Sequence, residues 1–414
     1  MHHANLLLPA AFVASLAALS PSRAQWTVTN LHTAGASSSI GSDTTTTQQV
    51  GWTAEPGTWR ASIWSGSAAA WTDLTPTALA VTECYAFATT GTHQVGRAMI
   101  GGQYHASLWN NSAASWIDLH PATATESTAA DIAITPTGTQ QVGSATISAV
   151  QRACLWSGSA ATYTDLHPAG ANLSVAQSTT GTQQAGYARI GGVVRAGVWS
   201  GTAASWLDLH PVSVPGLTVS VANATSGAQQ AGYAVISSTQ RACTWAGSAA
   251  SFTDLHPAGS SQSLAYATDG TYQVGIAYFS GVSRASIWSG TAASWEDLSL
   301  ALPGSWTSTN ARAVSSDGTT LTVIGSGFNL ETSRIEALVW IRPLNPAACD
   351  TIDFNGDELF PDTQDIADFL TVFGGGECPT GPESCGDIDF NNDELFPDTQ
   401  DIDALLRTFA GGAC

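Results

Sequence analysis

Two short acidic motifs near the end of the chain carry the residue types that bind calcium. The first motif places Asp353, Asn355 and Asp357 at alternate positions. The second motif repeats this spacing with Asp389, Asn391 and Asp393. In a calcium loop, alternate side-chain oxygens fold around the ion and the backbone carbonyl at the seventh position adds a ligand. That position is Leu359 or Leu395, so the spacing predicts two Ca²⁺ sites.

The later part of each loop departs from the usual calcium-loop pattern. The glycine expected at the sixth position is a glutamate in both loops. The closing carboxylate is Asp365 or Asp401, at position thirteen rather than twelve, and Asp362 or Asp398 is the alternative ligand. A side chain at the sharp turn should weaken binding, so we expect dissociation constants of about 10⁻⁴ to 10⁻³ M. A pair of acidic loops without metal is the competing interpretation.

An amphipathic helix is predicted after each loop. Apolar residues recur at the i, i+3, i+4 and i+7 positions of one helix face: Ile366, Phe369, Leu370 and Phe373, then Ile402, Leu405, Leu406 and Phe409. One apolar stripe per unit would let the two units pack together. The tandem pair, over residues 346–414, resembles a dockerin, or the dockerin-like calcium module of secreted planctomycete proteins. Membership of the dockerin family would imply a cohesin-like protein partner.

Four cysteines bracket these two units. Cys349 and Cys378 enclose the first unit, and Cys385 and Cys414 enclose the second. In an exported protein such spacing favours disulfides. We predict one disulfide within each unit, with a bond between Cys349 and Cys414 as the alternative.

The part of the chain before the two loop-helix units consists of copies of an internal repeat. One copy, at residues 229–257, reads QQAGYAVISSTQRACTWAGSAASFTDLHP. Seven copies can be aligned on one glycine: Gly51, Gly96, Gly143, Gly186, Gly232, Gly275 and Gly325. A period in the forties with several short apolar runs is typical of four-stranded propeller blades. We therefore predict a mainly β fold, a seven-bladed β-propeller over residues 25–345, followed by the small helical module. In the fifth copy the strands are expected at 263–269, 229–236, 241–247 and 251–257.

The two ends of the repeat region complement each other. Residues Gln25 to His32 match a lone fourth strand, and the seventh copy lacks one. We predict that this first strand closes the seventh blade, which removes an open sheet edge. Copy length varies in the segment joining one blade to the next, on the face that also holds the turns between second and third strands. This variable face is the expected binding face, with these aromatic candidates: Trp306, Tyr104, Trp59 and Phe328.

Four residue types recur at fixed places in the blades. A tryptophan ends each third strand and is expected to pack between neighbouring sheets. An arginine and an aspartate thirteen residues apart, such as Arg241 and Asp254, should form a cross-strand ion pair worth about 0.2 to 1 kcal/mol. A ring of anion-binding arginines is the alternative. The histidines after the Asp-Leu pair, such as His256, are expected to stabilise turns rather than to form a metal site.

These repeated motifs resemble the extracellular HAF-type repeat family, whose copies read roughly GQVVG, HAFLW and DLG. The segment from His105 to Trp109, HASLW, comes near the family's namesake triplet, whereas most copies have arginine at the first position. The resemblance covers about residues 25–345. It implies a secreted propeller and no defined ligand.

The charge distribution of the chain excludes some classes of partner, and its first residues indicate the cellular compartment. The chain contains no lysine, and 16 of its 32 acidic residues lie between Asp350 and Cys414. Nucleic acids and anionic membrane surfaces attract clustered Lys and Arg, so neither is an expected partner. Residues 1–24 combine a short apolar run with a small-residue cleavage site and are predicted to be a secretory signal peptide. We expect a secreted protein with no membrane span.

Together these features predict a secreted, non-enzymatic binding or scaffold protein. The propeller would bind a carbohydrate or protein ligand, and the calcium-dependent tail would dock to a protein partner. No motif for a catalytic nucleophile is recognised, and no catalytic residue is assigned. The alternative is a propeller glycoside hydrolase or lyase attached to an assembly through the tail. A structural surface-layer or adhesive component is the third possibility.

Overall fold

The computed structural model describes residues 26–344, 353–355, 363–378, 388, 390 and 399–409. Residues Trp26–Leu344 form one compact unit, and the described residues beyond Leu344 belong to another.

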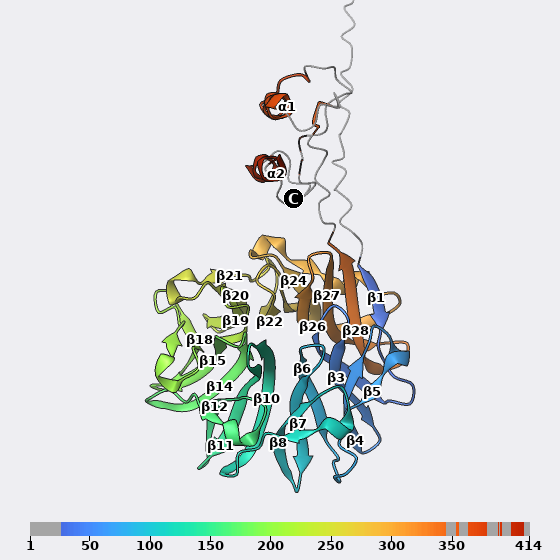
Figure 1. Cartoon of the computed structure of the whole chain (residues 1–414), viewed down its shortest axis with the longest axis vertical. Helices are drawn as coiled ribbons and strands as arrows, with labels where there is room; N and C mark the ends of the chain where they lie inside the picture. Colours follow the sequence, from blue (N-terminus) through green and yellow to red (C-terminus); the bar gives the residue numbers. More distant parts are fainter. Residues whose placement is uncertain are drawn as a thin grey trace, which may run out of the picture. The chain divides into compact units, whose positions relative to one another are not determined.

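Seven four-stranded antiparallel sheets make up the first unit, which is a seven-bladed β-propeller (Figure 1). The strands of the first four blades are β2 (Ser38–Thr44), β3 (Gln49–Glu55), β4 (Thr58–Trp64) and β5 (Thr72–Asp73); β6 (Cys84–Thr89), β7 (Gln94–Ile100), β8 (Gln103–Trp109) and β9 (Ile117–Asp118); β10 (Ala124–Thr135), β11 (Gly138–Ile147), β12 (Val150–Trp156) and β13 (Thr164–Asp165); β14 (Ala171–Thr179), β15 (Gln184–Ile190), β16 (Val193–Trp199) and β17 (Leu207–Asp208).

The last three blades follow the same order. Their strands are β18 (Leu217–Thr225), β19 (Gln230–Ile236), β20 (Thr239–Trp245) and β21 (Thr253–Asp254); β22 (Gln262–Thr268), β23 (Gln273–Phe279), β24 (Val282–Trp288) and β25 (Glu296–Asp297); β26 (Trp306–Ser316), β27 (Thr320–Asn329), β28 (Arg334–Pro343) and β1 (Thr27–Asn30). The first strand of each blade contacts the first strands of the two neighbouring blades, so these inner strands close a ring.

The seventh blade takes its outer strand from the other end of the propeller, as predicted. Strand β1 pairs antiparallel with β28, with Thr27 opposite Ile341 and Asn30 opposite Leu338 (Figure 1). The Asn30 side chain donates a hydrogen bond to Glu336 over 2.6 Å. This pair replaces the Arg–Asp pair of other blades.

Two details of the strand assignment were wrong. The segment 263–269, expected in the fifth blade, forms most of β22 in the sixth, because each blade begins with the strand that precedes its glycine. The fourth strands of blades one to six are two residues long rather than seven, because a short 3₁₀ helix occupies the start of each predicted strand. These helices are η1 (Ala68–Ala70), η2 (Ala113–Ser115), η3 (Ala160–Thr162), η4 (Ala203–Ser205), η5 (Ala249–Ser251) and η6 (Ala292–Ser294), and η7 (Leu298–Ala301) follows β25.

The repeated tryptophan is buried in the core; it ends the third strand in the first six blades, whereas Trp340 lies inside β28 in the seventh. All seven have exposed fractions of 1% or less. Trp245, for example, packs with Ala222 of its own blade and with Val198 and Leu209 of the preceding blade. A large aromatic side chain of this kind contributes much apolar surface to the contact between sheets, which confirms the predicted role.

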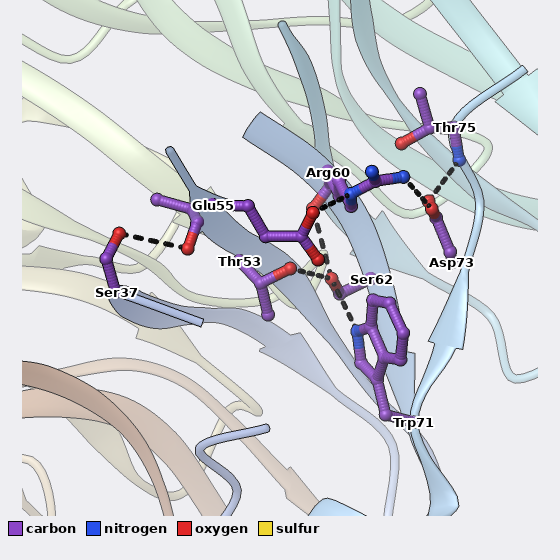
Figure 2. A network of polar contacts seen from close by, with 9 residues as sticks. Ser37, Thr53, Glu55, Arg60, Ser62, Trp71, Asp73 and Thr75 are labelled. Atoms are coloured by element: carbon purple, nitrogen blue, oxygen red, sulfur yellow. Dashed lines mark hydrogen bonds and ion pairs between the residues drawn. The ribbon is translucent and has the colours of Figure 1, made fainter. Parts of the chain in front are cut away.

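The predicted cross-strand ion pairs are present. In Figure 2, Arg60 lies between two carboxylates, with Nε 2.8 Å from Glu55 and Nη1 2.7 Å from Asp73. The equivalent pairs measure between 2.6 and 2.9 Å: Arg152–Asp165, Arg195–Asp208, Arg241–Asp254 and Arg284–Asp297, with His105–Asp118 in the second blade. Because an aspartate engages each of these guanidinium groups, the anion-binding ring is not supported.

The repeated histidines join the blade connections to the next inner strand. In His256, Nδ1 lies 2.7 Å from Ser263 Oγ and Nε2 lies 3.0 Å from the Ser260 carbonyl. Burial lowers the pKa of His256, and nearby Arg241 lowers it further. The geometry agrees with a structural turn histidine.

A double-mutant cycle on one ion pair should give a small coupling energy. Arg241 and Asp254 are both about one-third exposed, so solvent screens their attraction. We expect urea unfolding of Arg241→Ala, Asp254→Ala and the double variant to give a coupling of about 0.2 to 1 kcal/mol. The coupling should fall in 1 M NaCl. A value above about 2 kcal/mol that salt leaves unchanged would contradict a screened pair.

Backbone hydrogen bonds confirm which segments share the variable face. The Trp59 N–H, next to the turn between β3 and β4, donates to the Thr82 carbonyl in the connection to the second blade over 2.9 Å. In the sixth blade, Ser261 N–H donates to the Tyr278 carbonyl over 2.9 Å. The variable connections therefore lie beside the turns between second and third strands.

The second unit contains helices α1 (Thr363–Phe373) and α2 (Thr399–Phe409). Its described core joins both loop-helix units and consists of Phe354, Phe369, Ile388, Phe390 and Leu405. The apolar stripes are narrower than predicted, because Leu370 and Leu406 are 47% and 46% exposed. Among the described residues, no helix is long and apolar enough to cross a membrane.

Candidate functional site

The inner strand of every blade contains a β-bulge. Its pairing with the second strand shifts by one residue at the same place in all seven blades. The seven residues at the shift, here called the bulge residues, are Ser42, Phe87, Ala130, Gln177, Asn223, Tyr266 and Arg312. A bulge leaves one residue unpaired and re-aims its side chain, so these positions are structurally distinct from the regular ladder.

The repeat glycine exists because of this bulge. In the fifth blade, Gly232 pairs with Ala222, the residue before Asn223. A Cβ atom on Gly232 would collide with the Val221 backbone carbonyl, and each of the seven equivalent glycines meets the corresponding carbonyl. Only glycine leaves room for this close approach of two backbones. The period that identifies the blades therefore also marks the bulges.

All seven bulge residues line one central cavity of about 450 Å³. Ile40, Trp52 and Thr128 complete its lining. Because every inner strand contributes a bulge residue, the cavity lies at the centre of the ring. Its wall has two halves. Consecutive blades four to seven supply Gln177, Asn223, Tyr266 and Arg312, whereas the first three blades supply mainly apolar side chains.

Arg312 is the charged side chain of this lining. Its guanidinium lies 4.9 Å from the centre of the Tyr266 ring, and its Nε donates to Asn310 Oδ1 over 3.3 Å. Within the described chain, no carboxylate lies within 4.0 Å of it. The side chain is exposed to the cavity. It can therefore meet an anionic group, which the ion-paired repeat arginines cannot.

Aromatic side chains extend from the apolar half of the wall. Trp52 makes an edge contact with Tyr85 at a centroid distance of 5.7 Å. The Arg97 guanidinium lies 3.8 Å from the centre of the Tyr104 ring and 5.2 Å from that of Tyr85. Both tyrosine hydroxyls donate to Glu83. Desolvation and the Glu83 hydrogen bond raise the pKa of Tyr104, so this candidate binding residue is part of a packed cluster.

Two carboxylates follow bulge residues directly. Asp43 accepts a hydrogen bond from the Thr89 N–H over 2.8 Å, and Asp131 accepts one from the Thr179 N–H over 2.7 Å. Each bond joins a blade to the next. Burial, and after it the charge of Asp131, raise the pKa of Asp43 to about 7, and burial also raises the pKa of Asp131. The sequence analysis assigned neither residue a role, because the repeat has Ala or Ser at most equivalent positions.

The other aromatic candidates occupy separate places on the propeller. Trp306 lines a second, smaller cavity of about 260 Å³ beside Leu300, which is 80% exposed. Trp59 is 36% exposed. Phe328 is half-buried and pairs with Thr307 and Ile335. None of these three side chains lines the central cavity.

The described part of the tail contains some of the predicted calcium ligands. Asp365 and Asp401 lie in the first turns of α1 and α2, and both are fully buried. The Asn355 N–H donates to Asp365 Oδ1 over 3.4 Å, so the closing acid lies beside the third loop position. Asp353 is half-buried. The oxygen-rich chemistry and the loop-to-helix contact fit a calcium site.

The remaining tail predictions fall outside the described residues: Asp357, Leu359, Asp362, Asp389, Asn391, Asp393, Leu395 and Asp398. Of the four cysteines predicted to pair, Cys378 is described and the others are not, so the pairing stays a prediction. Among the described residues, no three acidic, histidine or cysteine side chains are grouped so that they could hold a metal. One tail residue was missed: Asp368, also buried, accepts a 3.0 Å hydrogen bond from Asn355 Nδ2.

Comparison with known proteins supports the fold alone. No protein-family profile and no curated protein sequence matches this chain. Among solved structures, a puromycin hydrolase is similar at 12% identity with a TM-score of 0.50, covering 73% of this chain and 53% of the hydrolase. An oligogalacturonate lyase in complex with manganese is 10% identical, with a TM-score of 0.49 and coverages of 78% and 98%.

The β-propeller domain of the Trilobed protease from Pyrococcus furiosus is 7% identical, with a TM-score of 0.47 and coverages of 74% and 97%. The present chain spans only about half the length of the puromycin hydrolase. At such identities a resemblance indicates architecture and does not transfer an activity.

Proposed function

We propose that this is a secreted binding protein whose propeller holds a ligand in its central cavity and whose tail docks to a protein partner in the presence of calcium. One observation carries the proposal. The seven inner strands repeat the same bulge, yet their bulge residues are of seven different types and all face one cavity. A repeated scaffold with individual side chains directed at one concave space is suited to recognition.

The residues on either side of each bulge residue support ligand recognition, rather than core packing, as the reason why the bulge residues differ between blades. Each bulge residue is preceded by Gly or Ala and followed by Ala, Ser or Asp. Small flanking residues allow the inner strands to pack closely, so the bulge residue itself can differ in size and polarity between blades. Aromatic rings, two amides and one guanidinium can then orient a bound molecule.

A cavity-filling substitution should abolish ligand binding without unfolding the propeller. Ala130→Trp places a large ring in the cavity wall. We expect the full-length protein to give saturation-transfer NMR signals with some members of a glycan and small-molecule panel, and Ala130→Trp to lose them. Thr137→Trp, at an exposed position in the neighbouring turn, is the matched control and should bind normally. Equal signals from Ala130→Trp and wild type would place binding elsewhere.

The tail is proposed to fold around two Ca²⁺ ions bound by the predicted loop ligands. The burial of Asp365 and Asp401 and the core shared by the two loop-helix units support this proposal. If the resemblance to dockerins holds, the docking partner is a cohesin-like domain. Secretion through the 1–24 signal peptide, with one disulfide in each unit, belongs to the same proposal.

Calorimetric titration with Ca²⁺ tests the metal sites. We expect binding heat for the wild-type chain, with dissociation constants of about 10⁻⁴ to 10⁻³ M, and its loss in Asp357→Ala/Asp393→Ala. Glu377→Ala, which removes an exposed acid outside both loops, is the control for general charge effects. Unchanged heat in the double variant would eliminate the calcium proposal.

A further inference from the structure

We infer that the central cavity binds a sugar that carries a carboxylate, with Arg312 as the group that recognises the carboxylate. This inference rests on the proposed binding function and adds the chemistry of the ligand. It is drawn from the charge of Arg312, from the polar groups beside it and from the apolar surface opposite.

The state of Arg312 differs from that of most propeller arginines. Five repeat arginines are paired with aspartates, and Arg342 is paired with Glu296 over 3.0 Å. Arg97 is packed against aromatic rings. By contrast, the terminal nitrogens of Arg312 have no hydrogen-bond partner in the described part of the chain. A guanidinium whose other contacts are already made can bind a carboxylate through two parallel hydrogen bonds.

Two contacts hold Arg312 in place before a ligand arrives. The bond from Nε to Asn310 Oδ1 fixes one edge of the guanidinium, and the Tyr266 ring lies against it. Such pre-organisation reduces the rotamer entropy lost on binding. The terminal nitrogens, which form the opposite edge, are therefore available to an anion.

The neighbouring polar groups suit hydroxyl groups. Asn223 Nδ2 donates to the Ala265 carbonyl over 2.8 Å, which leaves Asn223 Oδ1 as an acceptor toward the cavity. Gln177, in the preceding blade, makes no hydrogen bond within the described chain and can offer both a donor and an acceptor. Together with the Tyr266 hydroxyl, these groups form a polar arc beside the cation.

The opposite arc is mainly apolar and aromatic, although it also contains the hydroxyl groups of Ser42 and Thr128. Ile40, Trp52 and Phe87 line this side, and Ala130 between them and the polar arc leaves space. A sugar ring has hydroxyl groups at its edge and C–H groups on its faces, so it can satisfy both arcs at once. The carboxylates of Asp43 and Asp131 accept inter-blade backbone hydrogen bonds, and their raised pKa values lessen the negative charge that an anionic ligand would meet.

Paired sugars that differ in the carboxylate provide the test. Glucuronate and glucose are titrated into the full-length protein and followed by NMR and calorimetry. We expect glucuronate to bind about tenfold more tightly than glucose, as one charge-assisted hydrogen-bonded contact allows. Arg312→Gln should remove this preference. Arg312→Lys keeps the charge but loses the two parallel hydrogen-bond donors of the guanidinium, so it should retain part of the preference. Unchanged unfolding midpoints would show that each variant is folded.

The outcomes separate this inference from the proposed function. If both sugars bind equally and Ala130→Trp abolishes the binding, the cavity is a ligand site and the carboxylate preference is wrong. A preference that survives Arg312→Gln would also overturn the role of Arg312. If no sugar and no other member of the panel binds, both the inference and the proposed function of the propeller fail.

Discussion

Gly232→Ala should destabilise the propeller by about 3 kcal/mol, at the upper end of the range for an added methyl group in a packed interior. The new Cβ would collide with the Val221 carbonyl, which is backbone and cannot move without changing the bulge at Asn223. The cost should appear as a lower urea midpoint. Since the bulge positions Asn223 in the cavity, ligand binding should weaken in the same variant.

Gly101→Ala is the appropriate control for this substitution. Gly101 lies in an exposed turn with a φ of 58°, and an added Cβ would meet nothing within 4 Å. Alanine in the left-handed region costs about 1 to 2 kcal/mol, so the control carries backbone strain without a collision, whereas Gly232, which has no positive φ, carries the collision without that strain. If the two variants unfold at the same denaturant concentration, the collision argument for the repeat glycine is wrong.

The blade count and the closure could be predicted because they depend on features that repeat in the sequence. Glycine and tryptophan recur once per blade, and the lone strand at residues 27–30 complements the incomplete seventh copy. The Arg–Asp pairs were also visible, since thirteen residues separate the partners in the five blades that contain them. Regular strand pairing converts such spacings into contacts.

The central cavity could not be predicted, because a bulge is a property of the register between two strands rather than of one segment. The sequence contains only an indirect sign of the bulge positions. Phe87, Gln177 and Tyr266 each lie between small residues in segments that are otherwise similar. Aromatic residues on the variable face drew the prediction toward Trp306 and Trp59 instead. The residues that line the cavity vary at one position inside an otherwise repeated strand, whereas the prediction relied on variation in the connections between blades.

The tail shows where helical periodicity is insufficient. Phe369 and Leu405 are buried, as a helical stripe predicts, but Leu370 and Leu406 remain exposed. Residues of the loop regions, including Phe354 and Phe390, fill the core in their place. Sequence period identifies the helix face but does not determine how wide a surface its partner covers.

Asp43→Asn should stabilise the protein at pH 8 and have little effect near pH 4. Burial and the charge of Asp131 raise the pKa of Asp43 from 3.8 to about 7 in the folded state. The folded state therefore holds a proton that the unfolded state has lost between these values. The stability that this proton provides is fully present below pH 3.8 and is lost as the pH rises through about 7.

The rise in the pKa of Asp43 sets an upper limit on the stability that Asp43→Asn can gain. About three pKa units correspond to roughly 4 kcal/mol, and we expect a gain of about 1 to 4 kcal/mol for Asp43→Asn at pH 8, measured by urea unfolding. Asparagine cannot ionise, yet its Oδ1 can still accept the hydrogen bond from the Thr89 N–H. The variant should therefore keep the contact between blades while removing the cost of a buried charge.

Asp317→Asn provides a control of opposite sign. Backbone and side-chain hydrogen bonds from Thr319 lower the pKa of Asp317, which lies in an exposed turn. Its contribution to stability is present above pH 3.8 and is lost as the pH falls through the lowered pKa, so this substitution should not stabilise the protein at pH 8. If Asp43→Asn lowered the unfolding midpoint at pH 8 as much as at pH 4, Asp43 would be a charged hydrogen-bond acceptor in the folded state. The proton assigned to Asp43 in the folded state would then be absent.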